Sequence, residues 1–283
     1  MTRISERIGF VGAGNMAEAL AGALVSTGLV DLERLLVADL DAGRLKHMEE
    51  TYGVKSDAAA GVFDRSDVVV IAVKPKDVPG VLEEFVKQPA YPPGQKKLLI
   101  SIAAGVRLAD MEKILYAGLS GNQAGMVPLV RVMPNTPALV CAGMAGLSPN
   151  RHATVHDTRL AREILAATGE VCDFDEDLMD AVTAVSGSGP AYVFYLAEAM
   201  IQGALEVGLS EADARKLVLA TVIGAARLLE ARGEGPAELR RKVTSPGGTT
   251  EAAVKVLDEA GVKDILGRAI KAARDRSREL APK

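Results

Sequence analysis

The sequence predicts an α/β protein with an amino-terminal, doubly wound Rossmann sheet and an all-helical carboxy-terminal domain. Three observations support this fold class. Short runs of β-branched and aliphatic residues alternate with helix-like segments over the first part of the chain, and a Gly-Ala-Gly turn follows the first run. Beyond residue 175 the strand signals give way to long segments rich in Ala and Leu. Strands that alternate with helices are typical of a parallel sheet covered on both faces.

The predicted strands are short and apolar on both faces, as expected for strands buried between two helical layers. They cover residues 8–11, 35–38, 68–73, 98–102 and 129–132, with two candidates for the sheet edge at 143–147 and 170–174. The helices predicted between them cover residues 16–26, 42–52, 78–86, 108–115 and 155–167. This order implies right-handed crossovers.

We place a domain boundary near residue 175, which gives a dinucleotide-binding domain of residues 1–175 and a helical domain of residues 176–283. Amphipathic patterns predict helices over residues 191–207, 211–232, 250–260 and 262–280. Ser210 is a suitable N-cap for the second of them, and Gly208 is suited to end the first. No heptad or solenoid repeat is visible.

Composition excludes several classes of function. The 283 residues carry 33 Lys and Arg against 37 Asp and Glu, a net charge of −4, which argues against a general nucleic-acid or membrane-surface binder. With 5 Tyr, 5 Phe and no Trp, base-stacking surfaces are not expected. The polar start and the absence of a long apolar segment predict a cytoplasmic protein without membrane spans.

The two cysteines, Cys141 and Cys172, are not part of a CxxC pair. We therefore expect neither a disulfide scaffold nor a structural metal site, and two reduced, mostly buried thiols. None of the three histidines follows Cys172, so chemistry in the carboxy-terminal part proceeds without an imidazole. That favours hydride transfer over reactions that need a strong base.

The turn at residues 12–17, Gly-Ala-Gly-Asn-Met-Ala, has the G-x-G-x-x-A pattern of a dinucleotide-binding loop. It follows a predicted strand and opens a predicted helix, so its backbone can approach a pyrophosphate. Asp39 ends the next strand, 25 residues after Gly14, where an acidic side chain meets the adenosine ribose. A carboxylate there favours NADH, whereas Arg44 and Lys46 nearby could neutralise the 2′-phosphate of NADPH, so both cofactors stay open.

Four further turns carry candidate site residues. Lys74, in the turn at 72–75, lies either near the cofactor or in solvent. Small residues at 102–104 suit either a flat nicotinamide or plain packing. Asn135, in the turn at 131–137, can bind a carboxamide or brace its loop. The turn at 244–250, Thr-Ser-Pro-Gly-Gly-Thr-Thr, precedes a helix and can hold a carboxylate, although an ordinary capping turn has the same composition.

Together, the segments GFVGAGNMA, AVKP, RVMPNTP, SGSGPAY and TSPGGTT resemble pyrroline-5-carboxylate reductase over essentially the whole chain. The resemblance implies reduction of Δ1-pyrroline-5-carboxylate to L-proline by NADPH or NADH, the last step of proline biosynthesis. It also implies that the helical domain binds substrate and forms a homodimer, with decamers common in the family. The apolar circumference of the predicted helix at 191–207 agrees with burial in such a dimer.

The resemblance assigns roles to residues that match the family's segments. The residues expected to bind the pyrophosphate are Val11, Gly12, Ala13, Gly14, Asn15 and Met16. Those expected to contact the nicotinamide half are Ala72, Val73, Lys74, Pro75, Ile102, Ala103 and Ala104. Those expected to bind the substrate are Ser245, Thr249, Thr250 and Glu176, with Thr250 as the catalytic residue whose hydroxyl hydrogen-bonds the ring nitrogen. Lys242, where some relatives have Asn, lies at the rim of that site.

Two alternative functions stay open from the residues alone. One is a related reductase of the β-hydroxyacid dehydrogenase type, which needs a helical Lys that the SGSGPAY segment does not supply. The other is a non-catalytic NAD(P)-binding sensor, which would not need the turn at 244–250.

Overall fold

The computed structural model describes residues 3–280, which divide into two compact units. The first unit comprises residues 3–188 together with 273–280, and the second is the helical segment Gly189–Ala272. The boundary predicted near residue 175 rests on the change in sequence texture and remains a prediction.

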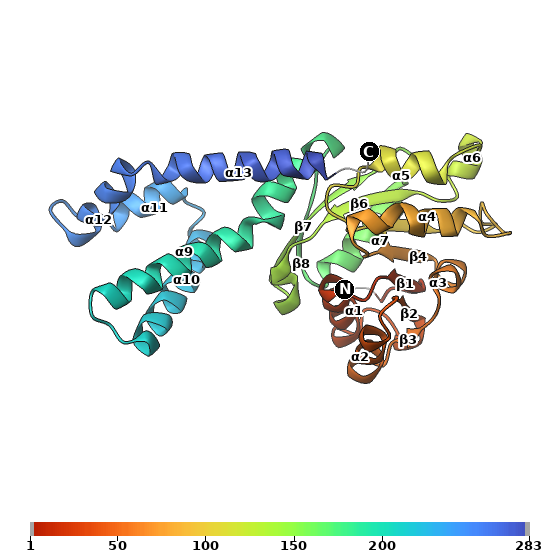
Figure 1. Ribbon diagram of the computed structural model, residues 1–283, viewed down its shortest axis with the longest axis horizontal. Helices are drawn as coiled ribbons and strands as arrows, with labels where there is room; N and C mark the ends of the chain where they lie inside the picture. Colours follow the sequence, from red (N-terminus) through yellow and green to blue (C-terminus); the bar gives the residue numbers. More distant parts are fainter. Residues whose placement is uncertain (1–2, 281–283) are drawn as a thin grey trace. The chain divides into compact units, whose positions relative to one another are not determined.

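The first unit is built on an eight-stranded sheet in the order β3-β2-β1-β4-β5-β6-β7-β8. Neighbouring strands are parallel except β6 and β7, which are antiparallel. The chain runs outward from β1 to β3 and then returns to place β4 on the other side of β1 (Figure 1). The strand order therefore reverses between β1 and β4, where ligands bind in folds of this class. The strands are β1 (Ile8–Val11), β2 (Leu35–Ala38), β3 (Lys55–Ser56), β4 (Val68–Ile71), β5 (Leu98–Ser101), β6 (Leu129–Met133), β7 (Gly143–Pro149) and β8 (Gly169–Asp173).

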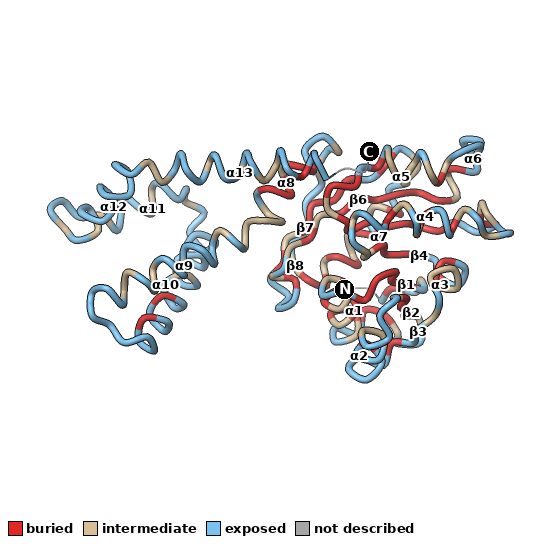
Figure 2. Tube along the Cα trace, viewed as in Figure 1, coloured by how far each residue is buried: buried red, intermediate tan, exposed pale blue. Residues whose placement is uncertain are grey.

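Helices cover both faces of this sheet. One apolar core joins it to α1 (Asn15–Ser26), α2 (Ala42–Tyr52) and α7 (Val155–Ala166). A second core, with Leu82 and Phe85, joins the opposite face to α3 (Ala59–Arg65), α4 (Val78–Val86) and α5 (Leu108–Leu115). Figure 2 shows the central strands β1, β4, β5 and β6 as buried almost throughout, which agrees with their being apolar on both faces.

Short elements complete the first unit. They are α6 (Gly121–Ala124), α8 (Met179–Val182), the π-helix Thr183–Gly187 and the 3₁₀ turns Leu32–Arg34, Pro75–Asp77, Thr136–Val140 and Glu176–Leu178. The second unit contains α9 (Gly189–Glu206), α10 (Glu211–Arg232), α11 (Pro236–Lys242), α12 (Thr249–Glu259) and most of α13 (Val262–Glu279).

The predicted fold class is confirmed, and each predicted strand and helix is present with ends within two residues. Ser210 caps α10 by accepting a hydrogen bond from the backbone N–H of Asp213. The short elements β3, α3, α6, α8 and α11 were not predicted, because they are too brief to show a period in the sequence.

The expectation that both thiols are mostly buried is wrong. Cys141 and Cys172 are free and exposed. Cys141 ends the 3₁₀ turn Thr136–Val140 in a left-handed conformation (φ 53°), and Cys172 lies on β8, the last strand of the sheet. A turn end and a strand with one neighbour leave side chains accessible, whatever their hydrophobicity.

A buried arginine joins segments that are far apart in the sequence. The side chain of Arg131, on β6, is 3% exposed, and its Nη1 donates to Glu176 Oε1 at 2.8 Å. Its Nη2 lies 3.6 Å from Asp180 Oδ1, which also accepts a 2.8 Å hydrogen bond from Ser277 Oγ. Glu176 Oε1 accepts a second hydrogen bond, of 3.0 Å, from the backbone N–H of Leu108. The last turn of α13 and the start of α5 are thereby fixed on the first unit.

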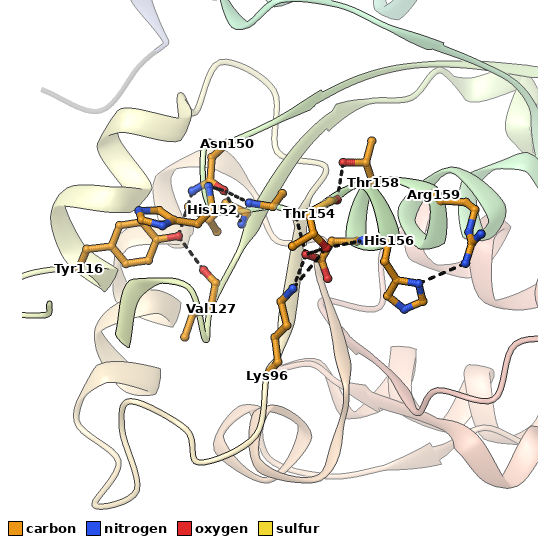
Figure 3. A network of polar contacts seen from close by, with 12 residues as sticks. Lys96, Tyr116, Val127, Asn150, His152, Thr154, His156, Thr158 and Arg159 are labelled. Carbon is orange, nitrogen blue, oxygen red and sulfur yellow. Dashed lines mark hydrogen bonds and ion pairs between the residues drawn. The ribbon is translucent and has the colours of Figure 1, made fainter. Parts of the chain in front are cut away.

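A second polar network lies where β5 and β6 begin (Figure 3). Asn150, just after β7, is buried, and its Oδ1 accepts hydrogen bonds from the backbone N–H groups of Leu129 and His152 at 3.2 and 3.1 Å. Its Nδ2 donates to Glu112 Oε1 at 2.8 Å and to the Tyr116 hydroxyl at 3.0 Å. One amide therefore connects β6 with α5 and with the turn before α7.

The same network contains a buried carboxylate at the start of α7. Asp157 Oδ2 accepts hydrogen bonds of 2.7 Å from both the backbone N–H and the hydroxyl of Thr154, the N-cap. Lys96 Nζ donates to the same oxygen at 2.5 Å. Burial by itself raises the pKa of Asp157, but the hydrogen bonds from Lys96 and Thr154 outweigh it and hold the pKa below the ordinary value of 3.8.

The second unit buries very little of its apolar surface on its own. Within Gly189–Ala272, Ala214 and Val218 are the only buried side chains. Phe194, Tyr195 and Leu196 on α9 are 65%, 75% and 56% exposed, and Figure 2 shows these helices largely in the colour of exposed residues. Apolar exposure on this scale is typical of an interaction surface.

The lowered pKa of Asp157 predicts an acid-sensitive contribution to stability. Because the folded pKa lies below the unfolded value, this contribution is present above pH 3.8 and is lost as the pH falls through the folded pKa. We expect Asp157→Asn to lower the free energy of unfolding at pH 7 by about 1–3 kcal/mol and to flatten its decline at acid pH. Urea unfolding between pH 7 and pH 3 measures both effects. The exposed Asp77→Asn is the control, and an Asp157 variant with an unchanged acid decline would contradict the prediction.

Candidate active site

The turn after β1 brings the ends of three strands together. Gly12 has φ +106°, and a Cβ there would lie 2.6 Å from the backbone carbonyl of Ala72. The Gly12 N–H donates to Ala38 O at 2.7 Å, and the Ala72 N–H donates to Val11 O at 2.8 Å. The close approach and the left-handed backbone both require glycine at position 12. β1 therefore ends against β2 and β4 at the point where the strand order reverses.

The start of α1 offers an open site for an anion. Gly14 is the N-cap, has extended backbone and makes no side-chain capping bond. A Cβ built on Gly14 would meet nothing within 4 Å. The N–H groups of Asn15 and Met16 follow in the first turn, where helical N–H groups lack intrahelical acceptors. These features fit the pyrophosphate of a dinucleotide, which needs a bare backbone and a helix N-terminus.

Asp39, directly after β2, is fixed by two backbone groups. Its Oδ2 accepts a 2.6 Å hydrogen bond from the Ala13 N–H, and its Oδ1 accepts one of 2.8 Å from the Asp41 N–H. Arg44 lies on the other side of the same loop, where its Nε donates to Ala13 O at 2.7 Å. The predicted ribose-binding carboxylate therefore sits beside the glycine turn.

The segments predicted to line the nicotinamide follow β4 and β5 at the same edge of the sheet. The Ile102 N–H donates to Ile71 O at 3.0 Å, which keeps the ends of these strands adjacent. Lys74 is exposed at the start of the turn Pro75–Asp77, whereas Ala103 is buried. Gly105, with φ +77°, lies against Ser277 and Leu280 near the end of α13. The loop after β5 is thus held by a helix from the far end of the chain.

Asn135 braces its loop with hydrogen bonds from both the oxygen and the nitrogen of its side-chain amide. Its Oδ1 accepts from the Met144 N–H at 2.9 Å, and its Nδ2 donates to the carbonyl and hydroxyl oxygens of Ser186 at 3.3 Å. Ser186 belongs to the π-helix Thr183–Gly187, an irregularity often found at functional sites. Bracing was one of the two roles considered for Asn135, and a role toward the cofactor remains a prediction.

Glu176 lies in the first unit and is the partner of Arg131. The other residues predicted to bind substrate, Lys242, Ser245, Thr249 and Thr250, lie in the second unit. The carboxylate of Glu176 already contacts Arg131 and the start of α5. These contacts give Glu176 a role in holding the fold together. Its assignment to the substrate remains a prediction from the resemblance.

The turn at 244–250 leads directly into α12 and is partly exposed, with Thr244, Gly248 and Thr250 half-buried. Gly248 is the N-cap, and Thr249 and Thr250 form the first turn of the helix. The Gly247 N–H donates to Glu251 Oε2 at 2.7 Å, and the Gly248 N–H donates to Ser245 O at 3.0 Å. Part of the turn's donor capacity is therefore used internally. The N–H groups and hydroxyls of the two threonines remain at the positive end of the helix.

Lys242, at the end of α11, forms an ion pair with Glu234 at 2.5 Å. This hydrogen bond raises the pKa of Lys242. The described residues contain no group of three or more His, Cys, Asp or Glu that could hold a metal ion. In the same part of the chain, no helix is both long enough and apolar enough to cross a bilayer.

Three residues that position the elements around the site were not predicted from the sequence: Arg131, Asp180 and Ser277. One signal was available, because Arg131 is a charged residue inside an otherwise apolar strand run. A charge in such a place needs partners. Nothing in the pattern identifies those partners, which are 45 or more positions away along the chain.

The switch-point turn, the open helix start and the acidic residue after β2 define a Rossmann-type oxidoreductase that uses NAD(P). Comparison with family models agrees. Residues 7–105 match NADP oxidoreductase, coenzyme F420-dependent, and residues 176–280 match pyrroline-5-carboxylate reductase dimerisation.

Individual relatives extend the match over the whole chain. Pyrroline-5-carboxylate reductase of Pseudomonas aeruginosa is 42% identical, with 97% of each chain covered. A solved pyrroline-5-carboxylate reductase from Coxiella burnetii is 36% identical with a TM-score of 0.87, covering 99% of this chain and all of its own. The Plasmodium falciparum enzyme solved with NADP bound is 27% identical with a TM-score of 0.85 and the same coverage. The chain belongs to the pyrroline-5-carboxylate reductase family, and these matches favour a reductase over both alternative functions.

Two glycine substitutions separate the fold of the turn from its binding role. We expect Gly12→Ala to destabilise the protein, because its Cβ meets the Ala72 backbone and its φ is left-handed. Gly14→Ala should keep its melting temperature, because its Cβ meets open space, but should lose about tenfold or more in ADP-ribose affinity because the methyl group stands where the phosphate approaches. Thermal melts and calorimetric titration measure the two effects. Unchanged affinity in Gly14→Ala would remove this turn from the dinucleotide site.

Proposed function

We propose that the chain reduces Δ1-pyrroline-5-carboxylate to L-proline with NADPH or NADH, the last step of proline biosynthesis. The observation that carries this proposal is that the family match spans both units. The dinucleotide turn lies on the first unit and the Ser-Pro-Gly-Gly-Thr-Thr turn on the second, and each belongs to a segment matched by its own family model. The geometry of the first turn fits a dinucleotide.

In this proposal, Val11 to Met16 hold the pyrophosphate and Asp39 the adenosine ribose. The segments 72–75 and 102–104, together with Asn135, line the nicotinamide half. The bound dinucleotide supplies the hydride. The chain's contribution is to place the substrate carbon toward it, so catalysis rests on positioning and fixed dipoles.

The substrate is held by the turn before α12. Its carboxylate meets the N–H groups and hydroxyls of Ser245 and Thr249 at the positive end of the helix. Thr250 donates its hydroxyl hydrogen bond to the ring nitrogen. As hydride reaches the adjacent carbon, the electron pair of the C=N bond moves onto this nitrogen, which takes up one proton from solvent through the hydroxyl and becomes the secondary amine of proline. Glu176 and Lys242 lie at the periphery. The partial exposure of this turn in the single chain supports the assignment, because a substrate can reach it.

We assign substrate binding and dimerisation to residues 176–283. The apolar exposure of Gly189–Ala272, with two buried side chains, supports a homodimer in which a second copy covers α9 and α10. Larger rings, up to a decamer of five dimers, are part of the proposal. So is a cytoplasmic location, because two free and exposed thiols suit a reducing compartment.

Thr250→Val tests the catalytic assignment. The substitution keeps the shape and removes the hydroxyl, so kcat for pyrroline-5-carboxylate should fall by roughly 10²-fold while the melting temperature stays the same. Steady-state oxidation of NADPH and NADH, with proline measured as product, provides the readout. Thr158→Val is a matched control, because Thr158 is also half-buried on a helix but lies in the first unit. Full turnover in Thr250→Val would exclude this residue from the mechanism.

Phe194→Glu tests the homodimer. A charge placed in a buried apolar interface needs a partner, so this variant should shift toward monomer in light scattering. Val155→Glu places the same charge on α7, at a side chain that is 88% exposed, and should leave the assembly unchanged. A monomeric wild-type protein would contradict the proposed assembly.

A further inference from the structure

We propose that the loop after β2 selects NADH over NADPH, and that Asp39 is the residue that determines this choice. The inference rests on the proposed function, because it concerns the cofactor of the same reaction. The two cofactors differ only by a phosphate on the adenosine 2′-hydroxyl, so the choice depends on the charge around that hydroxyl. In this fold the acidic residue at the end of the second strand faces it.

The Asp39 carboxylate is held in place and can still accept further hydrogen bonds. Each of its oxygens already accepts one backbone hydrogen bond, from Ala13 and from Asp41. A carboxylate oxygen has two lone pairs, so each oxygen can also accept a ribose hydroxyl. The two backbone bonds prevent the carboxylate from turning away, so a 2′-phosphate would meet a fixed negative charge.

The nearby cations already have carboxylate partners. Arg44 Nη2 donates to Glu18 Oε2 at 2.6 Å while its Nε bonds Ala13 O. Lys46 pairs with Glu50 at 3.6 Å. Their positions in the sequence made both residues candidates to neutralise the 2′-phosphate of NADPH. In the structure, Arg44 is the stronger candidate, and it is committed to a carboxylate and to the glycine turn.

The start of α2 is also closed to a phosphate. Asp41 is the N-cap, and its Oδ1 accepts hydrogen bonds from the N–H groups of Gly43 and Arg44 at 2.8 and 3.3 Å. A helix N-terminus is a ready anion site, but here its donors serve the protein's own carboxylate. The loop therefore presents the carboxylates of Asp39 and Asp41 and no uncommitted arginine.

The test uses fragments that lack the nicotinamide, so it does not depend on turnover. ADP-ribose and 2′-phospho-ADP-ribose are titrated calorimetrically into the full-length wild-type protein. We expect ADP-ribose to bind at least about tenfold more tightly, because the added phosphate is repelled by a fixed charge of the same sign, the Asp39 carboxylate. The ratio of kcat/KM for NADH and NADPH should show the same preference.

Asp39→Asn removes the charge while keeping an oxygen for the Ala13 N–H, and should raise the affinity for 2′-phospho-ADP-ribose more than that for ADP-ribose. Asp31→Asn is the matched control at the other end of β2, and should change neither affinity. Glu18→Gln is a second route that leaves Asp39 in place. By releasing Arg44 from its carboxylate, it should also improve binding of the phosphorylated fragment.

The outcomes separate this inference from the function on which it rests. Equal or tighter wild-type binding of 2′-phospho-ADP-ribose would overturn the selection of NADH and leave the reductase intact. Parallel changes of both affinities in Asp39→Asn would overturn the role of Asp39. Failure of both fragments to bind would instead contradict the proposed function itself.

Discussion

The guanidinium of Arg131 is the constraint around which the first unit is arranged. Burying a charge costs several kcal/mol unless it is paired and hydrogen-bonded, and Arg131 is almost fully enclosed. Its partners, Glu176 and Asp180, come from the segment that leads into the π-helix, and Asp180 also faces Arg107 and Arg278 at 3.6 and 3.7 Å. The strand, the segment before the helical unit and the end of α13 can reach low energy only together.

This coupling extends to the candidate site. Ser277, fixed by Asp180, lies against Gly105 in the loop after β5, and that loop carries the residues assigned to the nicotinamide. The chain leaves the first unit after Ser188, beside the Asn135 to Ser186 bond, and returns at residue 273, beside the Ser277 to Asp180 bond. Both connections to the helical unit are therefore anchored next to loops that the dinucleotide is proposed to contact.

The sequence predicts best what depends on local physics. Strands such as Val68–Ile71 and helices such as α10 follow from apolar periodicity and caps, and Gly12 follows from the need for a tight turn. The Arg131 network joins residues up to 98 positions apart, so no window of sequence contains it. Exposure of Cys141 depends on a turn end, and the state of Arg44 depends on Glu18, 26 positions away. The type of residue marks Arg131, Cys141 and Arg44 as candidates, but the contacts that each makes in the folded protein decide its role.

The two halves of the proposed site differ in what maintains them. The dinucleotide turn is built from backbone hydrogen bonds and close packing within one unit, so a single chain is sufficient to form it. The turn before α12 lies on a unit that buries only Ala214 and Val218, which is far too little apolar burial to offset the entropy of ordering five helices. The missing burial must come from other surfaces, most directly a second copy. Cofactor binding should therefore tolerate dilution of the protein better than turnover does, because the substrate half depends on association.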